Sequence, residues 1–346
     1  MATLTHTAYV SRKIIKFGGF GVLGLVIIYW IGGMAWMAWL AAHPPYVAPT
    51  VRFRILPKIV FSQKQIAKKD FTLELPNDAF PKFKDQANVY VIYRSKSVIG
   101  ALEETKKTAE LIGFKSPPTE QSTGIYQFND TATNRTLTMN VLADSFKLNY
   151  DYLNDQTLLN PENMPNNTEA ISLAKAFLSQ AGKLYKDLDE GESKISYWKI
   201  GFGSLTEIKG LSDANIIRVD FFRKQLDSEK NIVSENLDKS SVSVLLSGSG
   251  VAAKKIVEVN YKYVNVDDSA PSTYPIKTPE MAFADMKTGY YWPATDVEAK
   301  TVTIRKVSLA YFEPITPVQF LQPVYVFEGD GGFVGYVPAV TEKYTE

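Results

Sequence analysis

Hydrophobic positions follow three patterns along this chain. The 26 residues from Phe17 to Ala42 carry no charge. Every backbone N–H and C=O in lipid must be bonded within its own segment, so a run of this length predicts a membrane-spanning helix. Beyond it, alternation of apolar and polar residues predicts strands, and apolar residues spaced three and four apart predict helices.

Each predicted helix of the outer part has a capping residue at its start and a glycine near its end. These helices run from Ser97 to about Gly113, from Thr168 to Gly182, and from Thr278 to Gly289. Strands are predicted at 71–75, 88–93, 124–130, 135–142, 145–152, 194–202, 215–225, 240–247, 254–264, 300–312, 321–328 and 332–339.

This order predicts an α+β protein: one N-terminal transmembrane helix, then tandem units of one helix packed on an antiparallel β-sheet. The predicted segments are a cytoplasmic stub (1–16), the transmembrane helix (17–42), a proline-rich stalk (43–69) and three α+β units (70–152, 166–266 and 276–341). The second and third units share the order of a helix followed by three main strands, and the first is a fainter copy. Duplication explains this similarity, although chance alignment of amphipathic strands is the alternative.

Residues flanking the apolar run predict its orientation. Arg12, Lys13 and Lys16 precede it, and such a cationic flank is normally retained in the cytoplasm. Aromatic side chains favour the interface between bilayer and water, and the far half of the run holds Trp30, Trp36 and Trp39. We therefore expect a single-pass protein of the cell membrane with its N-terminus inside and most of the chain outside. A cleaved signal peptide is the alternative, but its apolar region is normally much shorter.

Composition excludes several functions for the outer part. The chain is 45% hydrophobic with a net charge of +1, and removing the three N-terminal cations leaves 35 basic and 37 acidic residues. We expect no nucleic-acid partner, because a protein without a basic field lacks the main attraction to phosphates. Cysteine is absent and the two histidines are His6 and His43. This excludes Ser-His-Asp and Cys-His catalysis, and we predict no enzyme activity, no metal site and no cofactor.

Two local motifs have both a functional and a structural interpretation. Tyr290, Tyr291 and Trp292 follow a predicted helix end, where large aromatics either anchor a partner or close a core. The acidic run that begins at Asp187 is similar to a calcium loop, but Trp198 stands at the twelfth position, which requires glutamate. We interpret that run as a solvated helix end.

The last 70 residues or so resemble a known family. The segments TPEMAFADMKTG, VSLAYFEP and FLQPVYVFEG resemble the C-terminal unit of YycH/YycI-type accessory proteins of two-component sensor kinases and, more distantly, PepSY modules. The matching positions are mostly core and turn residues: Ala282, Gly289, Leu309, Tyr311, Pro323 and Val324. The resemblance implies YycI/PepSY-like second and third units and a non-enzymatic regulatory role. It carries over no catalytic or binding residue.

Together these features predict a membrane-anchored extracytoplasmic protein that acts by binding, as a regulatory or assembly accessory factor. The expected partner is another membrane or envelope protein, and a homo-oligomer is possible. A structural subunit of a cell-surface complex is the alternative. An envelope hydrolase that uses carboxylates is the third possibility, since 37 acidic residues are available.

Overall fold

A computed structural model describes residues 4–42, 46–61, 69–93, 98–159, 163–227, 230–314 and 318–346. The chain divides into two compact units, Met1–Ala48 and Pro49–Glu346. Each unit is considered by itself below.

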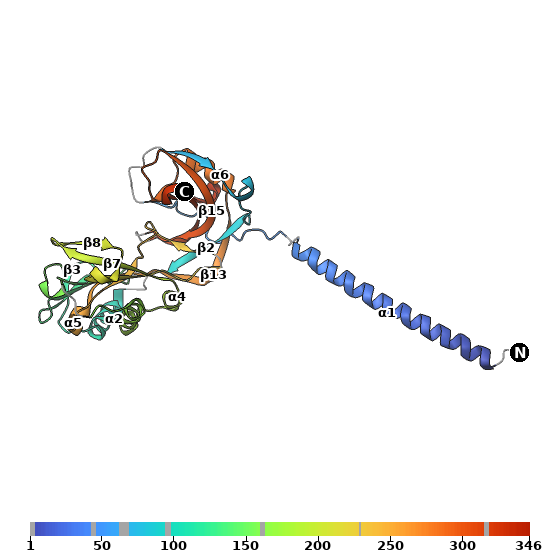
Figure 1. The fold of residues 1–346 in the computed structure, drawn as a ribbon, viewed down its shortest axis with the longest axis horizontal. Coiled ribbons are helices and arrows are strands. Elements are labelled where there is room, and N and C mark those ends of the chain that lie inside the picture. Colours follow the sequence, from blue (N-terminus) through green and yellow to red (C-terminus); the bar gives the residue numbers. More distant parts are fainter. Residues whose placement is uncertain are drawn as a thin grey trace. The chain divides into compact units, whose positions relative to one another are not determined.

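The first unit is a single helix, α1 (Leu4–Ala42), drawn in blue in Figure 1. Its 39 residues correspond to about 58 Å at the helical rise per residue. Residues Ala8–Ala42 are long and apolar enough to cross a membrane. The expected apolar helix is therefore confirmed. The helix also continues through the basic residues of the predicted stub without a break from Leu4 onward, and the assignment of residues 1–16 to the cytoplasm stays a prediction.

The second unit contains two β-sheets. The eight-stranded sheet consists of β1 (Asp70–Leu73), β2 (Gln86–Tyr93), β10 (Ile232–Val233), β13 (Asn265–Pro275), β14 (Trp292–Thr295), β15 (Thr301–Phe312), β16 (Phe320–Gly329) and β17 (Val334–Pro338). Its main order is β1-β15-β16-β17-β14, while β2 joins β13 to β16. Helix α6 (Pro279–Lys287) buries Ala282 and Met286 in the same core cluster as Phe327 and Val337.

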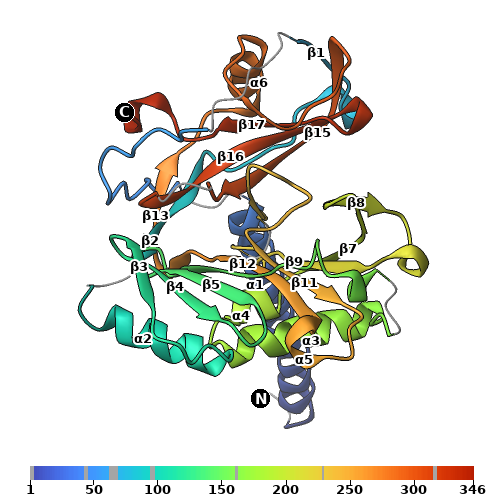
Figure 2. The ribbon, with the colours of Figure 1, turned by 90° about the vertical axis from the view of Figure 1, so that its left-hand side faces the viewer.

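The nine-stranded sheet has the order β3-β4-β5-β6-β12-β11-β9-β7-β8. Its strands are β3 (Thr119–Ser122), β4 (Ile125–Asp130), β5 (Arg135–Asn140), β6 (Ser145–Tyr150), β7 (Ser193–Gly201), β8 (Ser204–Ile208), β9 (Ile216–Phe221), β11 (Val242–Ser247) and β12 (Ile256–Lys262). Four helices lie along one face in Figure 2, namely α2 (Val98–Leu111), α3 (Asn167–Gln180), α4 (Lys186–Asp189) and α5 (Ala252–Lys255). Short 3-10 helices are η1 (Pro76–Asp78), η2 (Gln156–Leu158), η3 (Leu211–Asp213), η4 (Asp330–Gly332) and η5 (Glu342–Tyr344).

The helix-covered face of this sheet forms the larger core. Phe128 and Leu148 of the sheet are buried in one cluster with Ala174 and Leu178 of α3. Each of the two strand residues lies on the buried face of its strand, and the two helix residues are four positions apart, as the sequence pattern requires. The predicted α+β class, with helices packed on antiparallel sheets, is confirmed.

The boundaries of the three predicted units do not coincide with the two sheets. The segment 70–152 contributes β1 and β2 to the eight-stranded sheet and β3 to β6 to the nine-stranded sheet. The segment 166–266 continues the latter, because β6 and β12 pair as antiparallel neighbours. The structure therefore has two sheets, where the sequence predicts a separate sheet in each of three units. Edge pairing of this kind buries unpaired strand edges and leaves no trace in local sequence.

Strand order also bears on the predicted duplication. In the second unit β7, which follows the helices, pairs with β9, the next main strand. In the third unit β14, which follows α6, pairs instead with β17, the last strand. The second and third units thus differ in strand order. In the first unit the strands after α2 lie in sequential order, β3-β4-β5-β6, whereas in the second unit β8 lies outside β7 and the order is β8-β7-β9-β11-β12.

The segment 267–275, predicted as a break, lies within strand β13. It pairs with β2, and the register shift between Asp267 and Ser272 accommodates the intervening residues, Pro271 among them. A bulge of this kind lets a proline occupy a strand without breaking the ladder on both sides.

The helix starts are partly as predicted. Helix α6 begins after Thr278, whose side chain accepts a hydrogen bond from the N–H of Met281. Helix α3 begins two residues earlier than predicted, because Asn166 and Glu169 form a reciprocal capping box. Asparagine is at least as good a cap as threonine, so Thr168 falls inside the helix. Ser97 lies outside the described residues.

The predicted stalk of residues 43–69 is corrected over residues 49–61, because this described segment of the second unit packs on the eight-stranded sheet. Leu56 is fully buried and pairs with Thr345 in a parallel bridge. The Phe61 ring stacks on Trp292 with 5.7 Å between ring centroids. Apolar residues between the prolines therefore anchor the segment, and they outweigh the preference of proline for an isolated extended chain.

Candidate functional site: a groove between the two sheets

The candidate site begins where strand β9 leaves the nine-stranded sheet. After Phe221 the chain runs alongside the turn that follows α4, because Phe222 N–H donates to the carbonyl of Glu192 and Lys224 N–H donates to that of Asp187. The side chain of the intervening residue, Arg223, is 8% exposed. This backbone pairing fixes the direction in which the guanidinium points.

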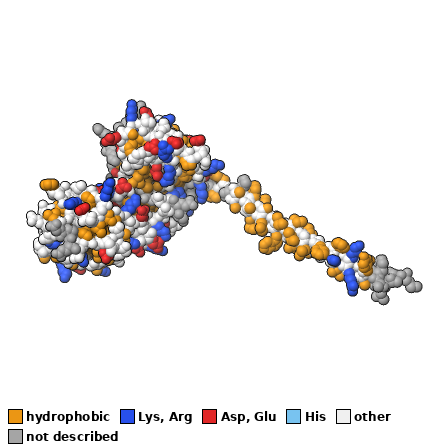
Figure 3. Space-filling view, viewed as in Figure 1, with side chains coloured by type: hydrophobic (Ala, Val, Ile, Leu, Met, Phe, Trp, Pro, Cys, Tyr) orange, Lys and Arg blue, Asp and Glu red, His pale blue; other side chains and the backbone are white. Residues whose placement is uncertain are grey.

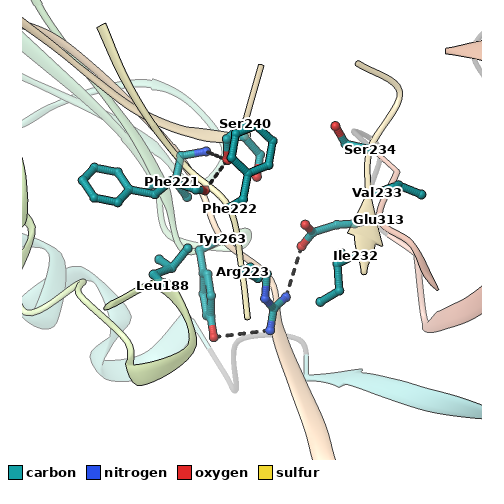
Figure 4. Close-up of a pocket in the computed structure, with 12 residues that line it drawn as sticks. Leu188, Phe221, Phe222, Arg223, Ile232, Val233, Ser234, Ser240, Tyr263 and Glu313 are labelled. Carbon is teal, nitrogen blue, oxygen red and sulfur yellow. Dashed lines mark hydrogen bonds and ion pairs between the residues drawn. The ribbon is translucent and has the colours of Figure 1, made fainter. Parts of the chain in front are cut away.

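The Arg223 guanidinium bonds groups from both sheets (Figure 4). On the nine-stranded side, Nε lies 2.6 Å from a carboxylate oxygen of Asp187, and Nη1 donates to the carbonyl of Val264 at 2.7 Å. The group also stacks over the ring of Tyr263, 4.6 Å from its centroid. Glu313 follows β15 of the eight-stranded sheet and lies 3.3 Å from Nη1. One cation therefore joins the ends of β9, β12 and β15.

Burial and charge act in opposite directions on this cluster. Burial raises the pKa of Glu313, and the nearby Arg223 opposes that rise without reversing it. Burial alone would lower the pKa of Arg223, but its interactions with Glu313, Tyr263 and Asp187 together outweigh burial and raise that pKa. Arg223 is shared with Asp187, which is the nearer carboxylate. The net charge of Arg223, Asp187 and Glu313 together is therefore no more negative than −1.

An open groove with a volume of about 530 Å³ lies beside Arg223. Its lining comes from the turn after α4, from the segment after β9 and from β10 with the loop that follows it: Glu190, Gly191, Glu192, Lys194, Phe222, Arg223, Lys224, Gln225, Asn231, Ile232, Val233, Ser234, Asn236 and Leu237. This volume falls within the range of small-molecule and short-peptide sites. A smaller hollow of about 20 Å³ beside Arg223 has room for about one water molecule.

Charged side chains line one wall of the groove. Lys224 forms an ion pair with Glu190 at 2.7 Å, and this hydrogen bond lowers the pKa of Glu190. The ammonium of Lys194 lies over the ring of Phe222, 4.8 Å from its centroid. Lysine ammonium groups and amide side chains are therefore available to a polar or charged ligand at the opening.

The loop that forms the other wall is held by Asp227. Its carboxylate accepts hydrogen bonds from the hydroxyl groups of Tyr90 and Tyr311 and from the amide of Asn88. Burial would raise the pKa of Asp227, but these hydrogen bonds and the charge of Lys230 outweigh it and keep the pKa below the ordinary value. The loop is therefore fastened to the eight-stranded sheet at Asp227 and to the nine-stranded sheet at Arg223.

The strand β10 on this wall has one edge in the sheet. The N–H groups of Tyr311 and Glu313 donate to the carbonyls of Asn231 and Val233. Alternation along a strand directs the backbone N–H and C=O of Ile232 to the opposite edge. Such an edge, together with nearby amide and hydroxyl side chains, suits an extended polypeptide.

The groove does not assemble the groups of a known hydrolytic site. Of the two glutamates that line it, Glu190 forms an ion pair with Lys224, and the carboxylates of Asp187 and Glu313 beside it pair with Arg223. Within the described part of the chain, no cluster of three His, Asp or Glu residues is placed to hold a metal ion.

The three predicted docking aromatics divide between core and surface. Tyr291 and Trp292 are 6% and 3% exposed, because they pack under the sheet beside Phe71 and Phe61 respectively. Tyr290 is 45% exposed, and the buried Lys277 ammonium lies 5.5 Å from its ring centroid. Tyr291 and Trp292 are thus corrected to core residues, and Tyr290 alone of the three is open to a partner.

The predicted membrane anchors all lie on α1. In Figure 3 the apolar side chains cover this helix and basic ones gather near its N-terminal end. Those basic residues are Arg12, Lys13 and Lys16. Trp30, Trp36 and Trp39 are each more than half exposed, and the rings of Trp36 and Trp39 stack on one another.

Sequence patterns did not indicate the groove. The run at Asp187 was interpreted as a solvated helix end, but Asp187 lies in α4 and bonds both Arg223 and the hydroxyl of Tyr263. Arg223 and Glu313 are 90 positions apart and belong to no motif. A charged residue after a buried strand was the only local signal, and it is too common to select a site.

Comparison with known proteins identifies no family. No protein-family model matches the chain, and no curated protein matches it. The solved structures similar to it include a protein from Eubacterium rectale described as uncharacterized, with 13% identity and a TM-score of 0.39, where the match covers 76% of this chain and 82% of that one. The C-terminal domain of Bacillus megaterium YpeB has 13% identity and a TM-score of 0.31, covering 72% of this chain and 95% of that domain.

Both likenesses are weak, and neither supports an argument about function. The resemblance of the second and third units to YycH/YycI-type proteins and PepSY modules stays a prediction. The groove is therefore interpreted from its own residues.

Proposed function

We propose that this chain is a single-pass protein of the cell membrane whose outer part binds another membrane or envelope protein and regulates it or assists its assembly, without catalysis. The expected N-in orientation, with the bulk of the chain extracytoplasmic, belongs to this proposal. The resemblance of the C-terminal unit to kinase accessory proteins agrees with a regulatory role.

The observation that carries the proposal is the surface of α1. Within its apolar segment, Ala8–Ala42, no residue of the stretch that is apolar enough to span a membrane is buried. Side chains such as Ile15, Tyr29 and Trp30 are between 68% and 81% exposed. A continuous apolar surface of this length is stable only in lipid or against other apolar helices. This requirement supports the proposed attachment to a membrane.

The short connection to the folded unit supports tethered binding. Six residues, 43–48, separate the end of α1 from the first residue of the second unit. A fully extended chain from Ala42 to Pro49 reaches about 25 Å. Attachment of both proteins to one membrane raises their effective concentration relative to each other. Weak contacts in the groove then suffice for association.

The groove supports recognition of an extended segment of the partner. Ile232 offers a strand edge, Asn231 and Ser234 offer polar side chains, and Leu237 offers an apolar contact. Charge pairs at Arg223 and Lys224 hold the walls in place. Preorganised walls reduce the entropy lost on binding, which favours a weak but specific contact.

The test compares the full chain before and after its tether is cut. Crosslinking in native membranes first identifies a partner. A protease site inserted between Ala48 and Pro49 is then cleaved in those membranes, and the amount of partner that co-purifies is measured. We expect recovery of the partner to fall at least fivefold on cleavage. Undiminished recovery would refute the tether.

Variants of exposed lysines test the groove itself. Lys194→Glu reverses a charge at the groove opening and should lower partner recovery at least fivefold. Lys262→Glu reverses an exposed charge of β12 outside the groove and serves as the matched control. Equal recovery with both variants would place the contact elsewhere.

Protease added to whole cells tests the proposed orientation. If it left the outer part intact, the proposed orientation would be overturned.

A further inference from the structure

The hollow beside Arg223 contains a carboxylate that this cation does not fully neutralise. The Glu313 side chain is 10% exposed and lies 3.3 Å from Nη1 of Arg223. Asp187 lies nearer the same guanidinium and accepts a hydrogen bond from Nε at 2.6 Å. One positive charge is therefore shared by two carboxylates, and Glu313 is the more distant of them. Burial raises the pKa of Glu313 despite this cation, as expected for a carboxylate whose charge is undercompensated.

Acidic residues also exceed basic ones over the groove as a whole. The charged residues of its lining are two acidic and three basic: Glu190, Glu192, Lys194, Arg223 and Lys224. Asp187 and Glu313 beside it bring the acidic residues to four against three. With every group ionised the site therefore has a net charge of −1, and one positive charge on a ligand neutralises it.

The size and lining of the hollow suit an ammonium group. Its volume of about 20 Å³ holds about one water molecule, and an ammonium is similarly compact, whereas the planar guanidinium of arginine is larger. An ammonium has three N–H donors. Besides Glu313, three residues with hydroxyl groups line the hollow, namely Ser234, Ser240 and Ser241. Acceptors are therefore available for all three donors.

The hollow adjoins the larger groove. Five residues line both of them: Phe222, Arg223, Ile232, Val233 and Ser234. Figure 4 shows the carboxylate of Glu313 directed towards Arg223, with Ile232 on the same side of the hollow as Glu313. Phe222 and Ile232 thus provide apolar surface beside the way from the groove to Glu313, which suits the aliphatic stem of a lysine.

We propose that the groove binds an extended segment of its partner through a lysine whose ammonium enters the hollow and pairs with the carboxylate of Glu313. The backbone edge at Ile232 pairs with the main chain of that segment. The exposed Lys194 stays available to a carbonyl or carboxylate oxygen elsewhere in it. This inference rests on the proposed function, because it specifies the chemistry of the segment that the groove recognises.

Binding of a cation at Glu313 depends on pH. The charged and titratable groups that face it are Arg223 after β9, Asp187 of α4 and Tyr263 after β12, while β10 carries no titratable side chain. Its ion partners raise the pKa of Arg223, and burial raises the pKa of Tyr263, so neither loses its proton in weak acid. Glu313 is ionised above its raised pKa and neutral below it. Affinity for an ammonium should therefore fall as the pH falls through that value.

Disulfide tethering tests the inference in the full chain, which has no cysteine of its own. Ser234→Cys places a thiol on the wall shared by groove and hollow, and Asn236→Cys places one at an exposed position of the groove. Each protein, in mild detergent, is equilibrated with aminoethanethiol, aminopropanethiol or aminobutanethiol. Parallel samples receive the hydroxyl analogue of the same length, and mass spectrometry measures the fraction of mixed disulfide.

We expect the ammonium probe of the best length to be favoured over its hydroxyl analogue at least fivefold at pH 9, from at least one of the two positions. The preference should fall at least threefold between pH 9 and pH 5. The guanidinium analogue of that probe should be bound at least threefold less. Ser204→Cys, at an exposed position of β8 outside the groove, is the control and should show no preference.

Glu313→Gln in the responding protein tests whether this carboxylate is the one that binds the cation. It should abolish both the preference for ammonium and its pH dependence. The melting temperature should stay equal or rise, because the amide removes a buried charge. Glu207→Gln, on β8, is the matched control and should leave the preference within twofold.

Three results would overturn the inference. One is equal binding of ammonium and hydroxyl probes at both positions. Another is a preference that persists in Glu313→Gln, which would assign it to a different carboxylate. The third is stronger binding of the guanidinium probe. None of them bears on the tether experiment, which measures recovery of a partner. A recovery that falls on cleavage, without a preference for ammonium, would retain the proposed function and reject lysine as the group that the groove recognises.

Discussion

Arg223 illustrates how one residue joins two sheets. Its donors contact Asp187 and Val264 on one side and Glu313 on the other, while its own side chain is almost fully buried. Buried ion pairs of this kind contribute little to stability relative to apolar residues. Removing one partner is a different matter, because the remaining charges are then buried without compensation.

Arg223→Met should lower the free energy of unfolding by about 3–5 kcal/mol, because Asp187 and Glu313 lose their shared cation. Adding Glu313→Gln to this variant should recover part of the loss, since the amide removes one buried charge. Urea titration of the full chain in mild detergent measures both effects. Lys224→Met, at the exposed neighbouring position, is the control and should change little. Equal losses for Arg223→Met and the control would contradict a structural role of the cluster.

Asp227 gives a pH-dependent prediction. The pKa of this group lies below its ordinary value of 3.8 in the folded protein, so the unfolded chain binds more protons between the two values. Its contribution to stability is therefore complete above pH 4 to 5 and is lost as the pH falls through the folded pKa. Asp227→Asn should lower the free energy of unfolding by about 1–2 kcal/mol at pH 7. It should also flatten the acid limb of the stability curve, which urea titrations between pH 3 and 7 would show.

At the scale of single elements, helix starts depend on which polar residue captures the first free N–H groups. Asn166 accepts from the N–H of Glu169 at 3.0 Å, and the Glu169 carboxylate accepts from the N–H of Asn166 at 3.0 Å. Thr168 lies inside the first turn instead. Both residue types are good caps, so only the geometry of the preceding chain decides between them.

Asn166→Ala should therefore lower the free energy of unfolding by about 1 kcal/mol, because both hydrogen bonds of the capping box involve this residue. Thr168→Ala should have little effect or stabilise slightly, since alanine is the better residue within a helix. Denaturant titration of the two variants side by side measures the difference. A larger loss with Thr168→Ala would restore the assignment made from the sequence.

The pattern of apolar and polar residues identified most helices and strands, but it did not show which strands pair with each other. Alternation placed strands such as β5, β6 and β15 within a few residues, because each buries one face. It missed β13, whose Pro271 and Asp268 are tolerated only because a bulge against β2 displaces them. The groove could not be predicted from local pattern either, because Arg223 and Glu313 meet only through the packing of two sheets.

At the scale of the whole molecule, the two ends of the folded unit are fastened to each other. The N–H of Leu56 donates to the carbonyl of Tyr344, the N–H of Glu346 donates to the carbonyl of Leu56, and the N–H of Lys58 donates to the carbonyl of Glu346. The segment that begins the second unit thus enters the fold beside residues 344–346.

Deletion of residues 344–346 should release this entry segment without unfolding the sheets. Three backbone hydrogen bonds to the entry segment are lost, and the buried Leu56 is uncovered on one side. The remaining contacts include Phe61 against Trp292, the bonds near Thr273, and side-chain hydrogen bonds to the carbonyls of Arg54 and Pro57. We expect trypsin to cleave after Arg54 and Lys58 at least tenfold faster than in the intact chain, because local opening of the segment then costs much less free energy. Cleavage within β15 or β16 should stay slow, and mass spectrometry of the early fragments distinguishes the two. If all sites became susceptible together, the C-terminal residues would stabilise the whole fold instead of the tether alone.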